Sequence, residues 1–196
     1  RHADIVMKAV DEAGEHFILH LELRNDNDPE MALRMMHYYT DIALAYPDEL
    51  IRQYVIYIGK AALSMSHKIA HSEWHYAYQL IDMHTLDCEQ FMHQDNPDAL
   101  VLAILCDFKG KHSKEIVEGI IRRLIELTGN HPERLRNYLK MLETLSTNRN
   151  LSEIFEEVES KMLSEIEIEK LPSYRIGEAR GEARGEARGE ARGEAR

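Results

Sequence analysis

The chain has 196 residues, of which 44% are hydrophobic and 30% charged, and its formal net charge is -11. This composition excludes a fibrous or intrinsically disordered protein. The longest uncharged apolar run, residues 99–106, is much shorter than the ~20 residues that cross a bilayer, so we expect no transmembrane helix and no membrane partner. The acidic balance also excludes a protein that coats nucleic acid non-specifically, because such binding depends on an excess of Lys and Arg.

The excess acid is concentrated near the amino terminus. Residues 1–110 contain 8 Lys or Arg and 18 Asp or Glu, so we expect any cation site there. The two cysteines, Cys88 and Cys106, are far apart and form no CxxC motif. They indicate a reducing compartment, the cytoplasm, and neither a disulfide scaffold nor a zinc site.

Residues 4–24 carry the pattern of a β-hairpin. Segment 4–10 predicts a strand, Asp11–Glu15 a turn that contains Gly14, and segment 16–24 a second strand in which apolar and polar residues alternate. Because a strand begins almost at once after Arg1, we interpret the chain as truncated at its amino terminus.

A helix and two further strands follow. Asp28 and Pro29 predict the start of the helix, and Pro47 its end. The apolar stripe of this helix is expected to comprise Ala32, Met35, Met36, Tyr39, Ile42, Ala43 and Tyr46. Segments 51–58 and 76–82 predict the strands, the second of them with a weaker pattern. Strands mixed with helix in this order predict an α/β fold with a mixed sheet.

The remainder of the chain predicts helices and then a repeat. Amphipathic segments predict helices over 97–108, 113–128, 132–146 and 152–168. The tetrapeptide GEAR then occurs five times from Gly177 onwards, and in a helix its i,i+4 neighbours would carry like charges. We therefore predict an extended, solvated tail, and three regions: a core over 1–88, a helical region over 89–170 and the tail over 171–196.

The hairpin brings together the residues that carry chemistry. If Val10 pairs with His16, Asp4 lies directly opposite Glu22, and Arg24 follows on the same face of the strand. Two carboxylates so placed repel each other unless a cation lies between them, and Mg²⁺ or Mn²⁺ with oxygen ligands would relieve the repulsion. The alternative is that these residues are solvated charges on an exposed strand face, and the spacing alone leaves both interpretations open.

The same residues resemble a known nuclease motif. Ala3-Asp4, a turn and then HLELR at residues 20–24 resemble the motif of the PD-(D/E)XK nuclease superfamily, which pairs an Asp on one strand with acid-x-Lys on the next. Segment 20–44 is similar to the recombination-promoting nuclease and transposase branch, whose helix has Met, Arg and Tyr at set spacing. Here those residues are Met31, Arg34 and Tyr38.

The resemblance implies a restriction-endonuclease-like core and a metal-dependent DNA endonuclease linked to mobile elements or recombination. It implies Asp4 and Glu22 as ligands of Mg²⁺ or Mn²⁺ and as catalytic residues, with Arg24 at the third motif position. That position is usually Lys in the superfamily and often Gln in this branch. Arg keeps its proton, so Arg24 could orient groups or stabilise charge but not act as a base. The alternative function is a catalytically inactive DNA-binding or protein-interaction relative, and a homo-oligomer stays open.

Two weaker candidates complete the site residues. Arg34 and Tyr38 are expected on the polar side of their helix, where they contact either a DNA phosphate or the neighbouring acidic residues. His67, His71 and His75 recur at i, i+4 and i+8, a spacing that would align metal ligands on a helix. The serines between these histidines favour a loop instead.

Overall fold

A computed structural model describes residues 4–129 and 131–165 of the chain. Its described residues divide into two compact units. The first unit contains the residues up to Leu86 together with Leu105–Asp107, and the second contains Asp87–Ile104 and the described residues from Phe108 onwards. The GEAR repeats, and with them the predicted tail, lie outside the described residues.

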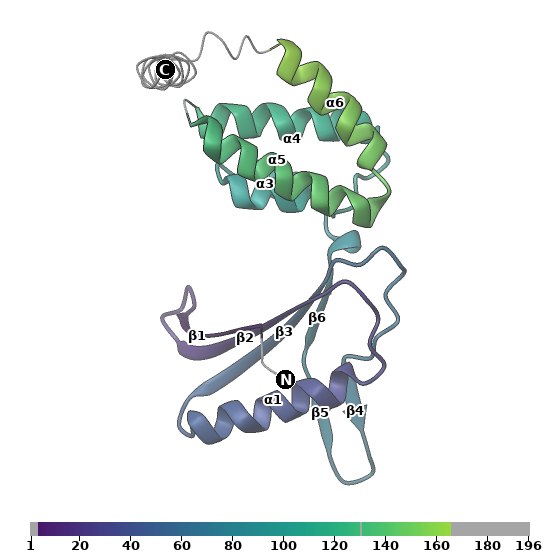
Figure 1. The fold of residues 1–196 in the computed structure, drawn as a ribbon. Coiled ribbons are helices and arrows are strands. Elements are labelled where there is room, and N and C mark those ends of the chain that lie inside the picture. Colours follow the sequence, from purple (N-terminus) through teal and green to yellow (C-terminus); the bar gives the residue numbers. More distant parts are fainter. Residues whose placement is uncertain (1–3, 130, 166–196) are drawn as a thin grey trace, which may run out of the picture. The chain divides into compact units, whose positions relative to one another are not determined.

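A four-stranded mixed sheet forms the first unit (Figure 1). Its strands are β1 (Ile5–Val10), β2 (His16–Arg24), β3 (Leu50–Tyr57) and β6 (Gln79–Asp82), in the order β1-β2-β3-β6. β1 is antiparallel to β2, whereas β2–β3 and β3–β6 are parallel. The predicted α/β class with a mixed sheet is therefore confirmed.

The turn between β1 and β2 fixes the register of the hairpin. Asp11 accepts hydrogen bonds at Oδ1 from the backbone amides of Ala13 and Glu15, and Gly14 has φ +82°, a conformation that favours glycine. Val10 consequently pairs with His16, as the sequence predicts.

The helix α1 (Met31–Ala45) covers one face of the sheet (Figure 1). It begins two residues later than expected, because Asp28 caps the turn before it. Oδ1 of Asp28 accepts from the amide of Glu30, and its carbonyl accepts from the amide of Met31. The apolar core of the unit comprises Met31, Ala32, Met35, Tyr38, Val55, Tyr57, Met65 and Tyr78.

The buried face of α1 differs from the predicted stripe. Tyr38 is buried, whereas Tyr39 and Tyr46 are exposed, so the prediction that Tyr38 lies on the polar side of the helix was wrong. The buried residues of α1 follow Met31 at spacings of 1, 4, 7 and 11 positions, which lie on one face of a helix. This face contains Tyr38 and not Tyr39, so it is rotated relative to the predicted stripe.

The segment after β3 forms a separate two-stranded hairpin, β4 (Lys68–Ala70) and β5 (His75–Ala77). The predicted strand over 76–82 is thus two strands in different sheets, β5 and β6. A 3₁₀ turn over Met83–Thr85 follows β6.

The second unit is helical, as predicted for the carboxy-terminal region (Figure 1). Its helices are α2 (Glu89–Met92), α3 (Pro97–Ala103), α4 (Ser113–Thr128), α5 (Pro132–Ser146) and α6 (Ser152–Glu165). α4 buries Ile116, Ile120 and Leu124 and ends at Gly129, whose φ of +51° permits the helix to stop there. None of the described helices combines the length and the hydrophobicity that a membrane span needs.

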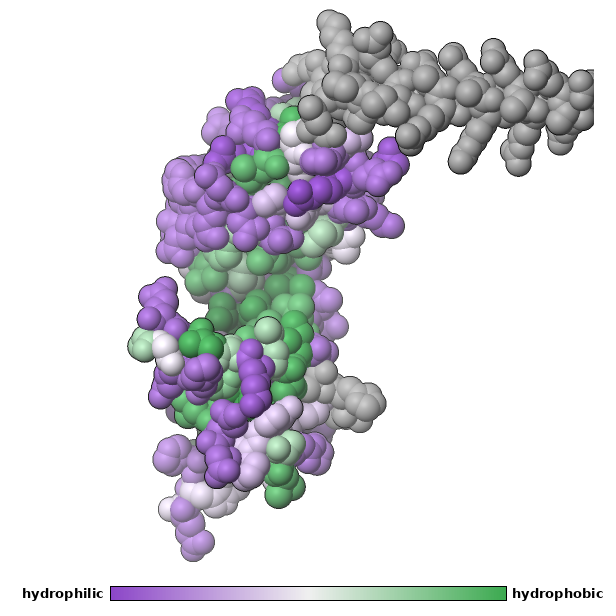
Figure 2. Space-filling model, turned by 90° about the vertical axis from the view of Figure 1, so that its left-hand side faces the viewer, coloured by the Kyte–Doolittle hydropathy of each residue, from purple (hydrophilic) through white to green (hydrophobic). Residues whose placement is uncertain are grey.

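The hydrophobic surface of the molecule is unevenly distributed. In Figure 2 the helical unit presents mainly hydrophilic residues, while the sheet unit shows areas of hydrophobic surface. Residues of β1 and of the strand ends contribute to it: Met7 is 52% exposed, Val10 55% and Leu23 47%.

Candidate functional site

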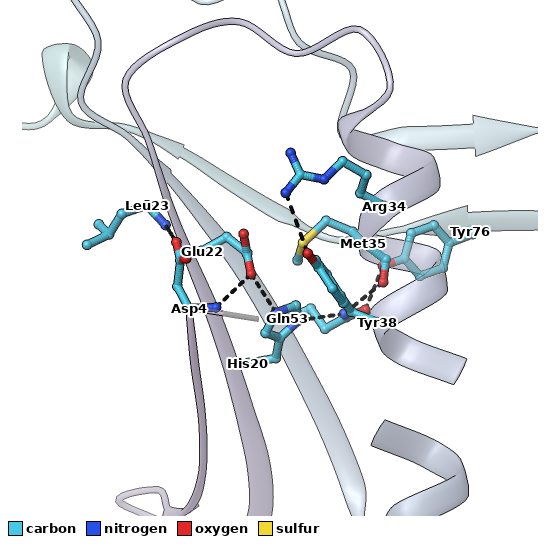
Figure 3. Close-up of polar contacts among 9 residues, drawn as sticks. All are labelled: Asp4, His20, Glu22, Leu23, Arg34, Met35, Tyr38, Gln53 and Tyr76. Carbon is cyan, nitrogen blue, oxygen red and sulfur yellow. Dashed lines mark hydrogen bonds and ion pairs between the residues drawn. The ribbon is translucent and has the colours of Figure 1, made fainter. Parts of the chain in front are cut away.

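Asp4 and Glu22 are neighbours in the structure. The backbone amide of Asp4 donates to Oε1 of Glu22 (2.9 Å), and the amide of Leu23 donates to Oδ2 of Asp4 (3.0 Å) (Figure 3). The hairpin register places the two residues opposite each other at the end of β1. The structure therefore brings the predicted pair of carboxylates together.

Glu22 is buried, although its neighbour Asp4 is exposed. The Glu22 side chain is 1% exposed, on the same strand face as Ile18 and His20, which are also buried. This is the face that α1 covers, since the ring of His20 lies edge-on to that of Tyr38, with centroids 5.2 Å apart. For Glu22, the alternative of a charge on an exposed strand face was wrong.

A chain of buried hydrogen bonds holds one oxygen of Glu22. Nε2 of His20 lies 3.2 Å from Oε1 of Glu22, and Nδ1 of His20 lies 2.8 Å from Nε2 of Gln53 on β3. Gln53 also donates to the carbonyl of Met35 (2.9 Å) and accepts at Oε1 from the hydroxyl of Tyr76 (2.6 Å) (Figure 3).

These contacts define the tautomer of His20. The carbonyl of Met35 can only accept, so the amide nitrogen of Gln53 must face it, and the second proton of that nitrogen points to Nδ1 of His20. Nδ1 is therefore an acceptor, and the ring proton is on Nε2, where it donates to Glu22. The network thus requires a neutral histidine and an accepting carboxylate.

The other oxygen of Glu22 has no hydrogen-bond partner among the described residues. Oε2 is buried and makes no hydrogen bond within the described part of the chain. A buried carboxylate oxygen without a partner is costly, and native proteins rarely contain one without an ion, a water or a functional reason. This oxygen is the feature of the site that fits a metal ligand.

Two arginines share one carboxylate near the carboxyl end of β2. Asp28 Oδ2 lies 2.8 Å from Nη1 of Arg34 and 3.4 Å from Nη2 of Arg24. The hydrogen bond from Arg34 is the main cause that holds the pKa of Asp28 below its usual value, with the amide of Glu30 adding to it. Asp28 alone can neutralise only one of the two guanidinium charges.

Arg34 and Tyr38 line a small cavity of about 250 Å³ together with Glu30, Leu33 and His37. Nη2 of Arg34 donates to the Tyr38 hydroxyl (3.5 Å), while Nε of Arg34 is buried without a hydrogen-bond partner among the described residues. Of the two alternatives left open for Arg34, the structure contains the acidic contact, with Asp28; binding of DNA by Arg34 and Tyr38 stays a prediction.

The three-histidine candidate does not form a helical stripe. His67 precedes β4, His71 lies in the turn of the hairpin, and His75 begins β5. Over residues 4–129 and 131–165, no three His, Cys, Asp or Glu side chains come together in a way that could hold a metal ion.

Sequence reasoning missed Gln53, Tyr76 and Asp28 as members of the site. A signal for Gln53 was present: it is the one amide in the β-rich segment IRQYVIYI, and a buried amide needs hydrogen-bond partners. Tyr76 has no comparable signal, because it reaches Gln53 from the separate β4–β5 hairpin.

Comparison of the chain with models of protein families, with curated protein sequences and with solved structures gave no match. The resemblance to the PD-(D/E)XK nucleases stays a prediction that rests on the motif residues themselves.

Proposed function

We propose that the protein is a metal-dependent DNA endonuclease. Its active site, which would hydrolyse phosphodiester bonds, contains Asp4 and Glu22. The observation that carries the proposal is the buried Oε2 of Glu22, which has no hydrogen-bond partner in residues 4–129 and 131–165, beside the exposed Asp4. Oxygen atoms of two carboxylates suit a hard divalent cation, Mg²⁺ or Mn²⁺. Such an ion, when bound, polarises a phosphodiester and lowers the pKa of a water molecule.

The protein's own residues supply the rest of the site. His20 and the Asp4 amide hold Oε1 of Glu22, so that Oε2 is the oxygen left to bind a cation. Arg24 and Arg34, which share Asp28, are the cationic groups that would attract and orient a DNA phosphate. Arg24 would stabilise charge on the scissile group.

The test is nicking of supercoiled plasmid by the full chain with Mg²⁺ or Mn²⁺. We expect cleavage that requires the cation and that Glu22→Gln reduces about a hundredfold or more. The matched control is Glu12→Gln, in the exposed hairpin turn, which should cleave normally. Cleavage that survives both Asp4→Ala and Glu22→Ala would contradict the assignment of the site.

A second candidate is a catalytically inactive DNA-binding or protein-interaction protein. It is favoured by the hydrogen bonds of Glu22 Oε1, which also suit a carboxylate that only anchors the end of β1 to β2. Thermal unfolding with added Mn²⁺ separates the two. An inactive scaffold would show no shift in Tm that depends on Glu22, whereas the proposed nuclease would be stabilised by bound cation.

A further inference from the structure

A cavity of about 640 Å³ lies in the first unit, and Gln53 is one of its lining residues. Its lining includes Ile51, Arg52, Gln53 and Tyr54, four consecutive residues of β3. Successive side chains of a strand point to opposite faces, so a cavity that touches all four adjoins the edge of the strand.

That edge of β3 is open beside the cavity. β2 pairs with β3 along its whole length, but the ladder to β6 begins only at Tyr54, opposite Gln79. Within the described chain, no strand pairs with this side of β3 before Tyr54. Its backbone therefore presents N–H and C=O groups to a ligand.

Tyrosine rings form the walls. Tyr39 from α1, Tyr76 from β5 and Tyr78 line the cavity, and the rings of Tyr39 and Tyr76 meet edge-to-face with centroids 6.2 Å apart. The hydroxyls of Tyr76 and Tyr78 are already bound, to Gln53 and to the carbonyl of Ser66. The Tyr39 ring, 42% exposed, has a surface free for stacking.

The lining is close to electrically neutral. Its guanidinium, Arg52, is paired with Asp11 (2.9 Å) and with Glu15. Burial raises the pKa of Tyr76 and Tyr78, that of Tyr78 to about 12, so both phenols stay uncharged. The guanidinium in the lining is thus already neutralised, and the lining also contains the imidazole of His75. A neutral ring would suffer no charge penalty beside either group.

From these features we infer that the cavity binds a planar, uncharged heteroaromatic ring of the nucleobase class. The ring stacks on tyrosine, and its donor and acceptor edge meets the open backbone of β3, which is the usual combination in recognition of bases outside a duplex. An extended peptide fits less well, because the open edge is only about four residues long before β6 begins. The volume is within the ~300–1,000 Å³ of small-molecule sites.

This inference goes beyond the proposed function, because the cavity needs no metal at Glu22. The hydrogen bond from Tyr76 to Gln53 nevertheless links its wall to the residue that fixes His20 and, through it, Glu22. Gln53 also lines the cavity, so a base bound there would lie one side chain away from the ring that holds the carboxylate.

The test measures binding of each of the four deoxynucleosides to the full chain, by NMR line broadening of the base protons. Deoxyribose 5-phosphate, which lacks a base, is the control ligand. We expect at least one deoxynucleoside to bind with Kd below 10 mM. Tyr39→Ala should weaken that binding about fivefold or more, since base stacking on an aromatic side chain is worth ~1–3 kcal/mol. Tyr46→Ala, at an equally exposed tyrosine of the same segment outside the cavity, should leave it unchanged.

Three results would overturn the inference: no deoxynucleoside binds, Tyr39→Ala binds as tightly as the unaltered chain, or deoxyribose 5-phosphate binds as well as the deoxynucleosides. Because Tyr39 is exposed, its replacement should not unfold the chain, and circular dichroism of both variants checks this. Loss of plasmid nicking in Glu22→Gln has no bearing on these readouts, so the two proposals fail separately.

Discussion

Glu22 is a carboxylate with one satisfied and one unsatisfied oxygen in a buried position. His20 and the amide of Asp4 hold Oε1, while Oε2 is without a partner in the part of the chain that the structure describes. Desolvation of an unpaired oxygen is costly, so the fold bears this cost at a defined point next to an exposed second carboxylate. The side chain that enforces this arrangement is Gln53, which uses all its hydrogen-bonding groups on Met35, His20 and Tyr76.

Replacing Gln53 with leucine should destabilise the protein by about 2 kcal/mol or more. The variant would leave the carbonyl of Met35, Nδ1 of His20 and the hydroxyl of Tyr76 without their partner, and each buried group left so costs ~1–3 kcal/mol. Urea unfolding measures the loss. Gln79→Leu, at an exposed glutamine of β6, is the control and should change the free energy of unfolding by less than ~0.5 kcal/mol.

A second readout separates the role of Gln53 in positioning His20 from general destabilisation. The ¹⁵N chemical shifts of the His20 ring should indicate a proton on Nε2 in the unaltered chain and a mixture of tautomers in Gln53→Leu. If the tautomer is the same in both, the assignment of Gln53 as the residue that orients His20 is wrong.

Asp28 makes the stability of the site depend on pH. Arg34 and the amide of Glu30 lower its pKa in the folded state, so its stabilising contribution is complete above the unfolded pKa of ~4. That contribution is lost as the pH falls through the lower, folded pKa. We expect Asp28→Asn to cost about 1–2 kcal/mol at pH 7, the value of hydrogen bonds to a charged group, and the difference from the unaltered chain to shrink towards pH 3.

Urea unfolding of both chains across pH 3–7 measures the effect of Asp28. Asp48→Asn, at an exposed carboxylate after α1, is the matched control. A difference between Asp28→Asn and the unaltered chain that is constant over the whole pH range would contradict the role of the Asp28 charge.

At the scale of elements, two loops approach each other closely at Gly59, after β3. A Cβ atom there would lie 1.8 Å from the carbonyl oxygen of Asn25 and 2.6 Å from the hydroxyl of Tyr57. The loop after β3 thus passes directly against the loop after β2, and the amide of Ile58 donates to the carbonyl of Arg24 (2.9 Å). This contact sets the end of β2 at Arg24, one of the two arginines that share Asp28.

Gly59→Ala should therefore destabilise the chain by ~3 kcal/mol or more, because backbone must move to admit the methyl group. Gly14→Ala is the comparison. There the added Cβ meets nothing within 4 Å, and only the positive φ opposes it, at a cost of about 1–2 kcal/mol. Thermal unfolding should give Gly59→Ala a clearly lower Tm than Gly14→Ala. The reverse order would contradict the close approach of the two loops at Gly59.

The alternation of apolar residues in strands and the Gly and Pro residues at turns and helix ends predicted the elements well, because both signals depend on residues that are close in sequence. The alternation of 16–24 and the turn at Gly14 gave the register that joins Asp4 to Glu22, and Pro132 to Ser146 forms the helix expected there. What could not be predicted depends on contacts distant in sequence. Alternation separates two faces of β2 but does not say which one a helix covers, and here the face with His20 and Glu22 is the buried one.

At the scale of the whole molecule, the net charge of -11 makes DNA an unfavourable partner for most of the surface. Binding of a polyanion then depends on the few cationic groups at the site and on a bound cation. The charge pattern separates this chain from proteins that hold DNA with an extended basic surface.

We therefore expect the full chain to bind a 20-base-pair duplex weakly in EDTA and measurably more tightly with Ca²⁺, which occupies carboxylate sites without supporting cleavage by most Mg²⁺ enzymes. Fluorescence anisotropy over a salt series should give a shallow slope of log K against log salt concentration, equivalent to about one to three phosphate contacts. Glu22→Gln should lose the effect of Ca²⁺. Tight binding in EDTA with a steep slope would mean that a basic surface, not the carboxylate pair, recognises DNA.

The short segment Leu105–Asp107 determines how the two units could be separated or exchanged by protein engineering. The amide of Asp107 donates to the carbonyl of Leu86 (2.7 Å), and Leu105 and Cys106 are fully buried. Since these residues belong with the sheet although they follow α3, the chain crosses the boundary between the units three times. The sheet unit therefore cannot be separated by one cut in the gene. A chain that stops at Leu86 would lack the returning segment Leu105–Asp107, and exchange of the helical unit between proteins would need three junctions.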